Sequence, residues 1–233
     1  NGLSRNVAQC LEDFDIPLYL SHTVTKVIGK NSLEGIEISQ VDENMKPIPG
    51  TEKYFECDTL LLSVGLVPEN ELTRQAGIEL DARTRGASVG EDMQTTEDGV
   101  FACGNVLHVH DLVDYVSAES ERAGKSAAKY VLGTAVTERD ALTVNGGPNV
   151  GYTVPQRINR ENVEKGVDIF FRVRKKMRAG EIRVDSNGEK IASFKREFLA
   201  PAEMEKITVP KVLLDKANGS ITVSAIEIEE EAK

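Results

Sequence analysis

The chain has 233 residues, 40% of them apolar, which is enough for one or two domains with cores of their own. Its 38 acidic and 28 basic residues give a net charge of -10, which argues against a nucleic-acid partner because such partners require a basic face. No apolar run of about 18 residues is present, so no membrane span is expected, and the sequence favours a cytoplasmic protein.

The first predicted elements in chain order are a helix, a short strand and an antiparallel meander. Apolar residues recur at helical spacing over residues 1–13, and a short apolar strand is expected over residues 16–20. Strands are then expected over residues 22–28, 33–41 and 52–57. The segments between them are rich in turn-forming residues, so neighbouring strands should pair with each other.

The middle of the chain has the pattern of a parallel α/β sheet. Thr59–Val64 is a nearly continuous apolar run, which suits a strand buried on both faces. A short polar helix over residues 70–76 follows it. Residues 100–103 form a second short apolar run, and a long helix is expected over about residues 114–132.

The remainder of the chain is predicted to be rich in strands. Gly146–Pro148 indicates a boundary loop, and Asp185–Gly188 has the composition of a hairpin turn. The basic stretch 172–178 is typical of a solvated strand edge that blocks unwanted pairing. The predicted strands cover residues 167–173, 180–184, 191–194, 207–213 and 221–228.

Four motifs stand in a specific order: Cys57–Gly65, then Pro68–Asn70, then Thr96, then Gly99–Asn105. Together they resemble the pyridine nucleotide-disulfide oxidoreductase superfamily, over roughly residues 1–132. Glu69 separates a proline and an asparagine that are adjacent in the superfamily pattern. The resemblance is strongest to FAD-dependent oxidoreductases without an active-site disulfide, which are found beside glycerol-3-phosphate dehydrogenase-like subunits.

The resemblance implies an α/β fold and a domain layout. The chain would be the C-terminal part of a flavoprotein fold with two dinucleotide domains, one for FAD and one for NAD(P), followed by a small β-rich domain. Residues 1–57 would be the tail of the NAD(P)-binding domain with its β-meander. Residues 58–135 would be the returning part of the FAD-binding domain, and residues 136–233 the β-rich domain.

The resemblance also implies cofactor-binding residues. Gly104 would let the backbone approach FAD closely, since a Cβ would intrude there. Asn105 stands where the family has an aspartate that contacts the flavin, and an amide can still accept a hydrogen bond. The backbone of Asp114, Tyr115 and Val116 would offer N–H groups to the flavin from a helix N-terminus. No catalytic residue is assigned.

The His108-x-His110-Asp111 motif has three interpretations. Two histidines at this spacing could share a metal ion, but only with further ligands that the sequence does not place. The motif could instead line the flavin site, or form an ordinary polar loop. No metal site is assigned. Asp111 or Asp114 could also be a plain helix N-cap.

The implied function is electron transfer between NAD(P)H and a partner dehydrogenase subunit or small substrate, through FAD. No Gly-x-Gly-x-x-Gly turn occurs in the chain, so the diphosphate clamps are absent from it. The chain is therefore expected to be an N-terminally truncated part of the enzyme and inactive alone. The alternatives are a non-catalytic interaction module derived from the same family, and a plain structural domain.

Overall fold

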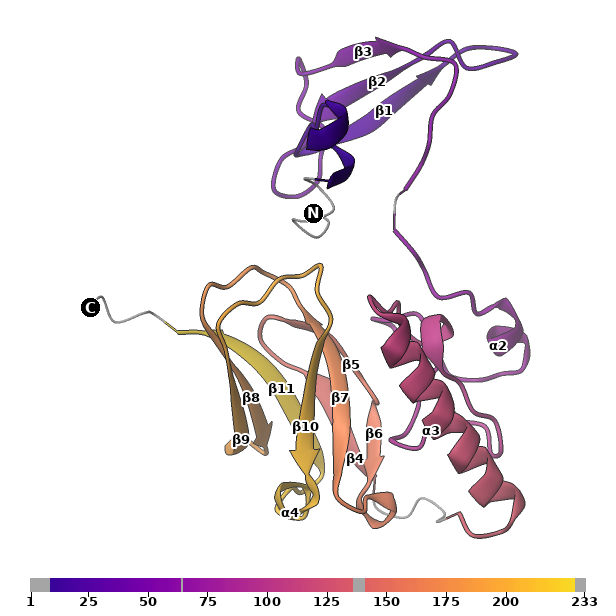
Figure 1. The fold of residues 1–233 in the computed structure, drawn as a ribbon, viewed down its shortest axis with the longest axis vertical. Helices are drawn as coiled ribbons and strands as arrows, with labels where there is room; N and C mark the ends of the chain where they lie inside the picture. Colours follow the sequence, from indigo (N-terminus) through magenta and orange to yellow (C-terminus); the bar gives the residue numbers. More distant parts are fainter. Residues whose placement is uncertain (1–8, 64, 136–140, 229–233) are drawn as a thin grey trace. The chain divides into compact units, whose positions relative to one another are not determined.

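The computed structural model describes residues 9–63, 65–135 and 141–228. The chain forms two compact units, residues 1–65 and residues 66–233, and Figure 1 shows the elements of each. The predicted domain boundaries after residues 57 and 135 remain predictions. The elements of the first unit are the 3-10 helix η1 (Glu12–Phe14) and the strands β1 (His22–Ile28), β2 (Gly35–Gln40) and β3 (Lys53–Glu56).

The first unit contains the antiparallel meander that the sequence predicts. Its three strands lie in the order β1-β2-β3, and both pairings are antiparallel. The predicted strand over residues 16–20 is wrong, because these residues form no ladder and are exposed. Of the predicted helix over residues 1–13, residues 9 and 10 are helical, and residues 1–8 lie outside the described residues.

The apolar run Thr59–Val64 does not form the buried strand expected of it. Its described residues 59–63 have no regular structure, and the side chains of Leu61 and Leu62 are 88% and 68% exposed. A strand buried on both faces needs neighbouring strands and covering helices. No described strand pairs with this segment, so its apolar residues are not part of any described sheet.

The second unit contains one long helix and two sheets. The predicted helix over residues 114–132 is confirmed as α3 to within one residue at each end, and the short polar helix is confirmed as α2. The predicted strand over residues 100–103 is wrong, since only Phe101 forms an isolated bridge, with Gln94. The helical elements are α2 (Glu71–Gln75), η2 (Gly104–Val106), α3 (Val113–Val131), η3 (Arg160–Asn162) and α4 (Lys211–Leu214).

Eight strands form the β-rich part of this unit. One sheet has the order β10-β7-β5 and the other the order β6-β4-β11-β8-β9, and among these pairings only β11 with β4 is parallel. The strands are β4 (Ala141–Gly146), β5 (Val150–Val154), β6 (Arg157–Asn159), β7 (Gly166–Val173), β8 (Gly180–Ser186), β9 (Glu189–Arg196), β10 (Glu205–Pro210) and β11 (Ser220–Glu227).

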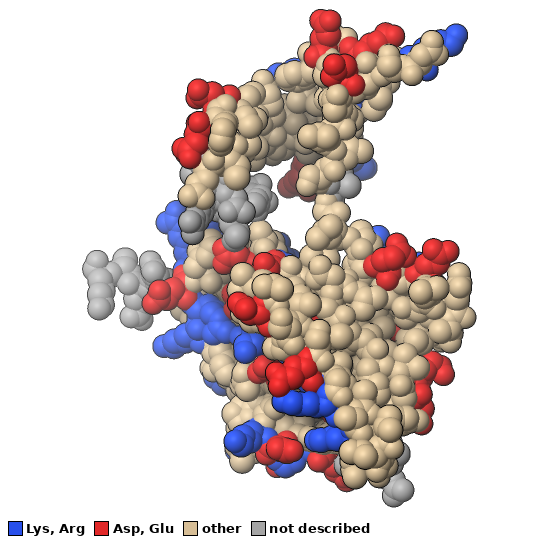
Figure 2. Space-filling view, turned by 45° about the vertical axis from the view of Figure 1, so that its right-hand side comes forward, with Lys and Arg blue, Asp and Glu red and all other residues tan. Residues whose placement is uncertain are grey.

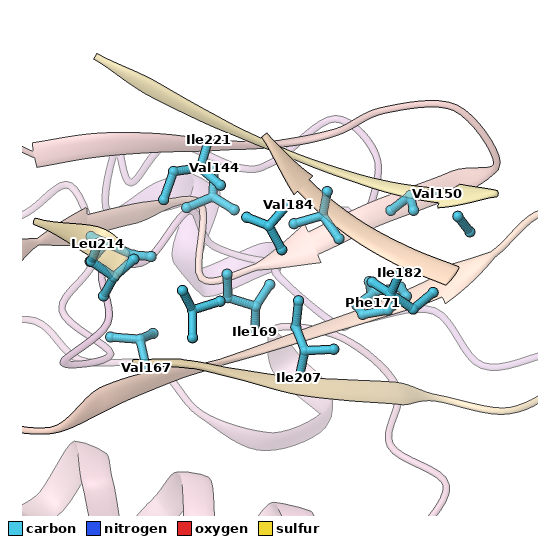
Figure 3. Packing of buried hydrophobic residues seen from close by; sticks show 14 of the residues in the cluster. Val144, Val150, Val167, Ile169, Phe171, Ile182, Val184, Ile207, Leu214 and Ile221 are labelled. Atoms are coloured by element: carbon cyan, nitrogen blue, oxygen red, sulfur yellow. The ribbon is translucent and has the colours of Figure 1, made fainter. Parts of the chain in front are cut away.

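The two sheets enclose one apolar core. Figure 3 shows side chains of β7 and β10, such as Phe171 and Ile207, facing side chains of β8 and β11, such as Val184 and Ile221. The predicted hairpin turn is confirmed between β8 and β9, where Asn187 and Gly188 have φ of 50° and 83°. Positive φ at both positions is the geometry that a tight two-residue turn requires.

Strand β7 has two different faces, and this alternation positions the candidate site. Val167, Ile169 and Phe171 point into the sandwich core. The intervening residues Phe170 and Arg172 lie on the other face, where they contact the segment before α3. Arg172 was expected on a solvated edge, but β7 is the middle strand of its sheet and this side chain is only 20% exposed.

The surface carries both charges. Figure 2 shows acidic and basic side chains next to each other on one face of the molecule, rather than one continuous basic field. Among the described helices, none combines the length and the apolar character needed to cross a membrane.

Candidate functional site

The segment 104–112, which comprises η2 and the loop before α3, contains two of the five predicted cofactor-binding residues, Gly104 and Asn105, and the other three lie in the first turn of α3. Gly104 begins it with a φ of 74°, a conformation that side chains other than glycine rarely adopt. A Cβ at this position would lie 3.3 Å from Cγ1 of Val116 on α3. The turn at Gly104 therefore requires glycine for its backbone and brings the loop close to the helix.

Asn105 is exposed and holds the loop in place. Its side-chain Oδ1 accepts a hydrogen bond of 3.1 Å from the backbone N–H of His110. Asn105 therefore closes a loop of five residues that contains His108 and ends at His110. The predicted contact of Gly104 and Asn105 with a flavin stays a prediction.

Helix α3 begins without a side-chain cap. Its N-cap residue is Leu112, so neither Asp111 nor Asp114 is the cap that the sequence suggested. The N–H of Tyr115 donates to the carbonyl oxygen of Leu112 at 3.2 Å, and Val116 already lies within the helix. Among the described residues, no group accepts a hydrogen bond from the N–H of Val113 or Asp114. The free donors thus stand one residue earlier than predicted.

Two histidines of the loop meet a glutamate of α3 in a buried cluster. His108 Nε2 lies 2.9 Å from Glu119 Oε1, and His110 Nε2 lies 3.0 Å from Glu119 Oε2. All three side chains are 1% exposed. Oε2 also accepts the backbone N–H of Gly104 at 2.7 Å. The histidines are thus buried, not part of a solvated polar loop, and Glu119 connects them to the turn at Gly104.

This cluster keeps a buried negative charge. Burial alone would raise the pKa of Glu119, but the hydrogen bonds from His108 and His110 outweigh it and lower that pKa to about 2. Burial lowers the pKa of His108, and its hydrogen bond to Glu119 only partly offsets this. Glu119 is therefore ionised and His108 neutral at neutral pH. The Nδ1 atoms of both histidines have no hydrogen-bond partner among the described residues.

Aromatic rings cover the cluster on the side of the β-sandwich. The ring of Phe170 contacts both imidazoles and the ring of Tyr115, with centroid distances from 5.4 to 6.1 Å. The ring of Tyr152, on β5, meets His108 edge-on at 5.8 Å. The β-rich part of the unit therefore supplies the apolar wall that keeps water from these polar groups.

Arg172 fixes the end of the loop to the sandwich. It forms an ion pair with Asp111 Oδ1 and donates to the carbonyl oxygens of Val109 at 3.0 Å and Ala202 at 2.7 Å. Asp111 Oδ2 in turn accepts the backbone N–H of Met204 at 2.6 Å. One guanidinium thus serves three acceptors from two segments, the loop before α3 and the turn before β10, an arrangement that its planar fork of donors suits.

Replacing Arg172 with lysine is expected to destabilise the second unit by about 1–3 kcal/mol, because one ammonium group cannot reach all three acceptors. The free energy of unfolding, measured by urea titration, tests this. The matched control is Arg174→Lys, which changes an exposed residue two positions along. Equal free energies of unfolding for the two variants would show that the contacts of Arg172 do not stabilise the second unit.

Asn70 is a further residue of the site. The sequence places it in the Pro68–Asn70 motif but predicts no role for it. Its side chain is 1% exposed, and Nδ2 donates to the carbonyl oxygens of Arg85 at 3.1 Å and Val106 at 2.9 Å. It therefore ties the segment before α2 to the turn that begins at Gly104.

A hollow lies elsewhere on α3, away from this cluster. It has a volume of about 690 Å³ and runs along the second half of the helix, beside Arg122 and Asp168. None of Gly104, Asn105 and residues 114–116 lines it. The hollow is therefore separate from the predicted cofactor residues.

Comparison with known proteins places the first half of the chain. The sequence signature described as "Pyridine nucleotide-disulphide oxidoreductase" matches residues 1–126, just over half of the chain. The chain belongs to the pyridine nucleotide-disulphide oxidoreductase family. The match covers the meander, the turn at Gly104 and the first part of α3, including Glu119. Members of the pyridine nucleotide-disulphide oxidoreductase family typically bind FAD and NAD(P)H.

Three relatives illustrate the breadth of this family. The small chain of glutamate synthase [NADPH] from Halomonas elongata is 28% identical over 56% of this chain and 30% of its own length. An NADH oxidase from Methanocaldococcus jannaschii is 25% identical over 54% of this chain and 27% of its own length. The mitochondrial dihydrolipoyl dehydrogenase of Caenorhabditis elegans is 32% identical, over 57% and 25%.

The chain spans less than a third of the length of these relatives. Among solved structures, a thioredoxin reductase from Gloeobacter violaceus aligns at 13% identity over 58% of this chain and 42% of that chain, with a TM-score of 0.29. That likeness is too low to support an argument about the fold. The family membership therefore rests on the sequence match, and a whole enzyme's activity does not follow from it.

Proposed function

We propose that this chain is part of a cytoplasmic FAD-dependent oxidoreductase that passes electrons between NAD(P)H and a partner dehydrogenase subunit or small substrate. The observation that carries the proposal is the uncapped N-terminus of α3 beside the turn at Gly104, within the segment that matches the family. The motif order further favours the group without an active-site disulfide, which occurs beside glycerol-3-phosphate dehydrogenase-like subunits. The Halomonas relative is itself named a small chain, which supports a partner subunit here.

The residues present fit the edge of a flavin. The free N–H groups of Val113 and Asp114 are donors at the positive end of a 19-residue helix, which suits the negative charge of a reduced flavin. Gly104 has no side chain, so a cofactor can approach its backbone closely. When bound, FAD supplies the hydride and electron chemistry, and the protein supplies position and electrostatics.

Gly104, Asn105 and the first turn of α3 would hold the flavin edge in this proposal. Asn105 keeps the loop closed through His110, which fixes the backbone that faces the cofactor. Asp114, Tyr115 and Val116 remain the predicted contacts, with the N–H of Val113 added to them. The direct test is to purify the complete gene product and measure its flavin content and its oxidation of NADH and NADPH. A protein without flavin and without either activity would contradict the proposal.

Gly104→Ala is expected to reduce the flavin content of that purified protein. The φ of 74° costs an alanine about 1–2 kcal/mol, and relieving the strain would move the backbone that faces the cofactor. Flavin per protein chain, measured by absorbance, gives the readout. The matched control is Gly124→Ala on α3, where an added Cβ meets nothing within 4 Å. If both variants keep the full flavin content, Gly104 does not contact the cofactor.

The non-catalytic interaction module remains the second candidate. One observation favours the interaction module. The side chain of Asn105, which stands where the family pattern has a charged aspartate, accepts a hydrogen bond from its own loop. The two candidates differ in one measurable respect, because a module of this kind would bind its partner without flavin present.

A further inference from the structure

The cluster of His108, His110 and Glu119 brings three metal-ligating side chains to one point. We propose that these residues bind a divalent metal ion, with Zn²⁺ as the best-suited ion. One ligand atom from each residue lies within 4.8 Å of the others, and the two Nε2 atoms face the two carboxylate oxygens. The two histidines alone lacked a further ligand in the sequence. Helix α3 supplies it.

The ligands are held in place before any ion binds. Asn105 closes the loop that bears both histidines, and the N–H of Gly104 orients one oxygen of Glu119. Ordering flexible side chains around an ion costs conformational entropy. Here the burial of all three side chains has already fixed them. The site therefore resembles a preformed metal site more than a set of surface residues that meet by chance.

The charge balance of the cluster also favours a cation. In the described chain, no Lys or Arg forms an ion pair with Glu119, because the nearby Arg172 is engaged by Asp111. A buried carboxylate is costly unless it is paired or coordinates a metal. Its hydrogen-bond donors in the structure are two imidazoles and one backbone amide. A divalent ion at this point would pair with the carboxylate directly.

The ligand set selects the kind of ion. Two imidazole nitrogens and one carboxylate form a ligand set that Zn²⁺ takes in proteins, whereas Mg²⁺ and Ca²⁺ prefer oxygen ligands alone. The aromatic rings of Phe170, Tyr115 and Tyr152 surround the imidazoles with an apolar wall, which strengthens electrostatic interactions inside it. The ion would join the loop at Gly104 to α3 and so act as a structural clamp.

The surroundings of the two histidines set an expectation for the affinity of the site for Zn²⁺. Coordination through Nε2 places a proton on each Nδ1, and neither Nδ1 has an acceptor among the described residues. Loss of such a partner typically weakens metal binding by about 10–100-fold. We therefore expect Zn²⁺ to bind more weakly here than at sites where each histidine donates to a carboxylate or carbonyl group.

The experiment measures metal content directly, without a histidine tag. The complete protein is treated with EDTA, exchanged into metal-free buffer, incubated with ZnSO₄, passed over a desalting column and analysed by mass spectrometry for metals. We expect close to one additional zinc ion per chain relative to Glu119→Gln. The variants His108→Ala and His110→Ala should lose the same ion. His22→Ala is the matched control, because His22 is the remaining histidine of this chain and lies in the first unit.

A second readout uses only the wild-type protein, so it does not depend on whether the variants fold. Co²⁺ added to the EDTA-treated wild-type protein should give visible absorption bands of nitrogen and oxygen ligation, and Zn²⁺ should abolish them. Two outcomes overturn the proposal: a wild-type protein that takes up neither ion, and equal zinc contents in the wild-type protein and Glu119→Gln. Either result is independent of flavin content, so it leaves the proposed function untouched.

Discussion

Glu119→Leu is expected to lower the stability of the second unit by about 3–5 kcal/mol, the cost of leaving a buried ionic network without one partner. The leucine fills much of the volume but removes the acceptor of three donors, which are His108, His110 and the N–H of Gly104. Each buried group left unsatisfied costs about 1–3 kcal/mol. Urea unfolding followed by far-UV circular dichroism gives the measurement.

The titration is run on EDTA-treated protein, so that the hydrogen bonds alone are tested and not a bound metal. The control is Glu121→Leu, two residues further along the same helix. Glu121 is exposed and pairs with Lys125 at 2.6 Å, one turn away. Its replacement is expected to leave the free energy of unfolding almost unchanged, because exposed pairs of this kind contribute little. A loss for Glu119→Leu no larger than that of the control would show that the cluster does not stabilise the fold.

Sequence patterns were sufficient where an element is determined by its own residues. The alternation in residues 22–28 and 220–227 gives strands at the expected positions, and the spacing in residues 114–132 gives α3. The turn at Asn187 and Gly188 follows from residues that tolerate positive φ. In each case the local preference and the final structure agree, so no distant partner was needed for the prediction.

The same patterns failed where an element depends on distant neighbours. Thr59–Val64 has the composition of a buried parallel strand, yet its described residues pair with none of the described strands. The prediction for residues 141–159 relied on the glycines and proline at 146–148, which indicated a boundary loop. In the structure these residues form only the turn between β4 and β5. Three strands were therefore missed.

The candidate site was predicted in part. The loop at Gly104 and the start of α3 follow from the family motif, whereas Glu119 went unnoticed. A signal for it exists in the sequence, because Tyr115, Glu119 and Ala123 recur every four residues on one face of α3. A glutamate on such a stripe needs partners for its charge. His108 and His110 are close in the chain, but only the folded loop shows that both histidines are the hydrogen-bond partners of Glu119.

Phe171→Ala is expected to destabilise the second unit by about 3–5 kcal/mol, because it removes a large side chain from the packed core between the two sheets. Phe171 is fully buried, and its neighbours come from both sheets (Figure 3). The control is Phe198→Ala, since Phe198 is 42% exposed and its loss should cost less than about 1 kcal/mol. Urea unfolding gives both values.

The same variant tests whether the sandwich and the candidate site unfold together. Phe171 packs in the core, while the adjacent Phe170 covers His108 and His110 from the opposite face of β7. Loss of the core should therefore release the site in the same transition. Far-UV circular dichroism follows the sheets, and near-UV signals of Tyr115 and Tyr152 follow the site. Coincident midpoints are expected in the variant. Separate midpoints would mean that the loop and α3 keep their structure without the sandwich behind them.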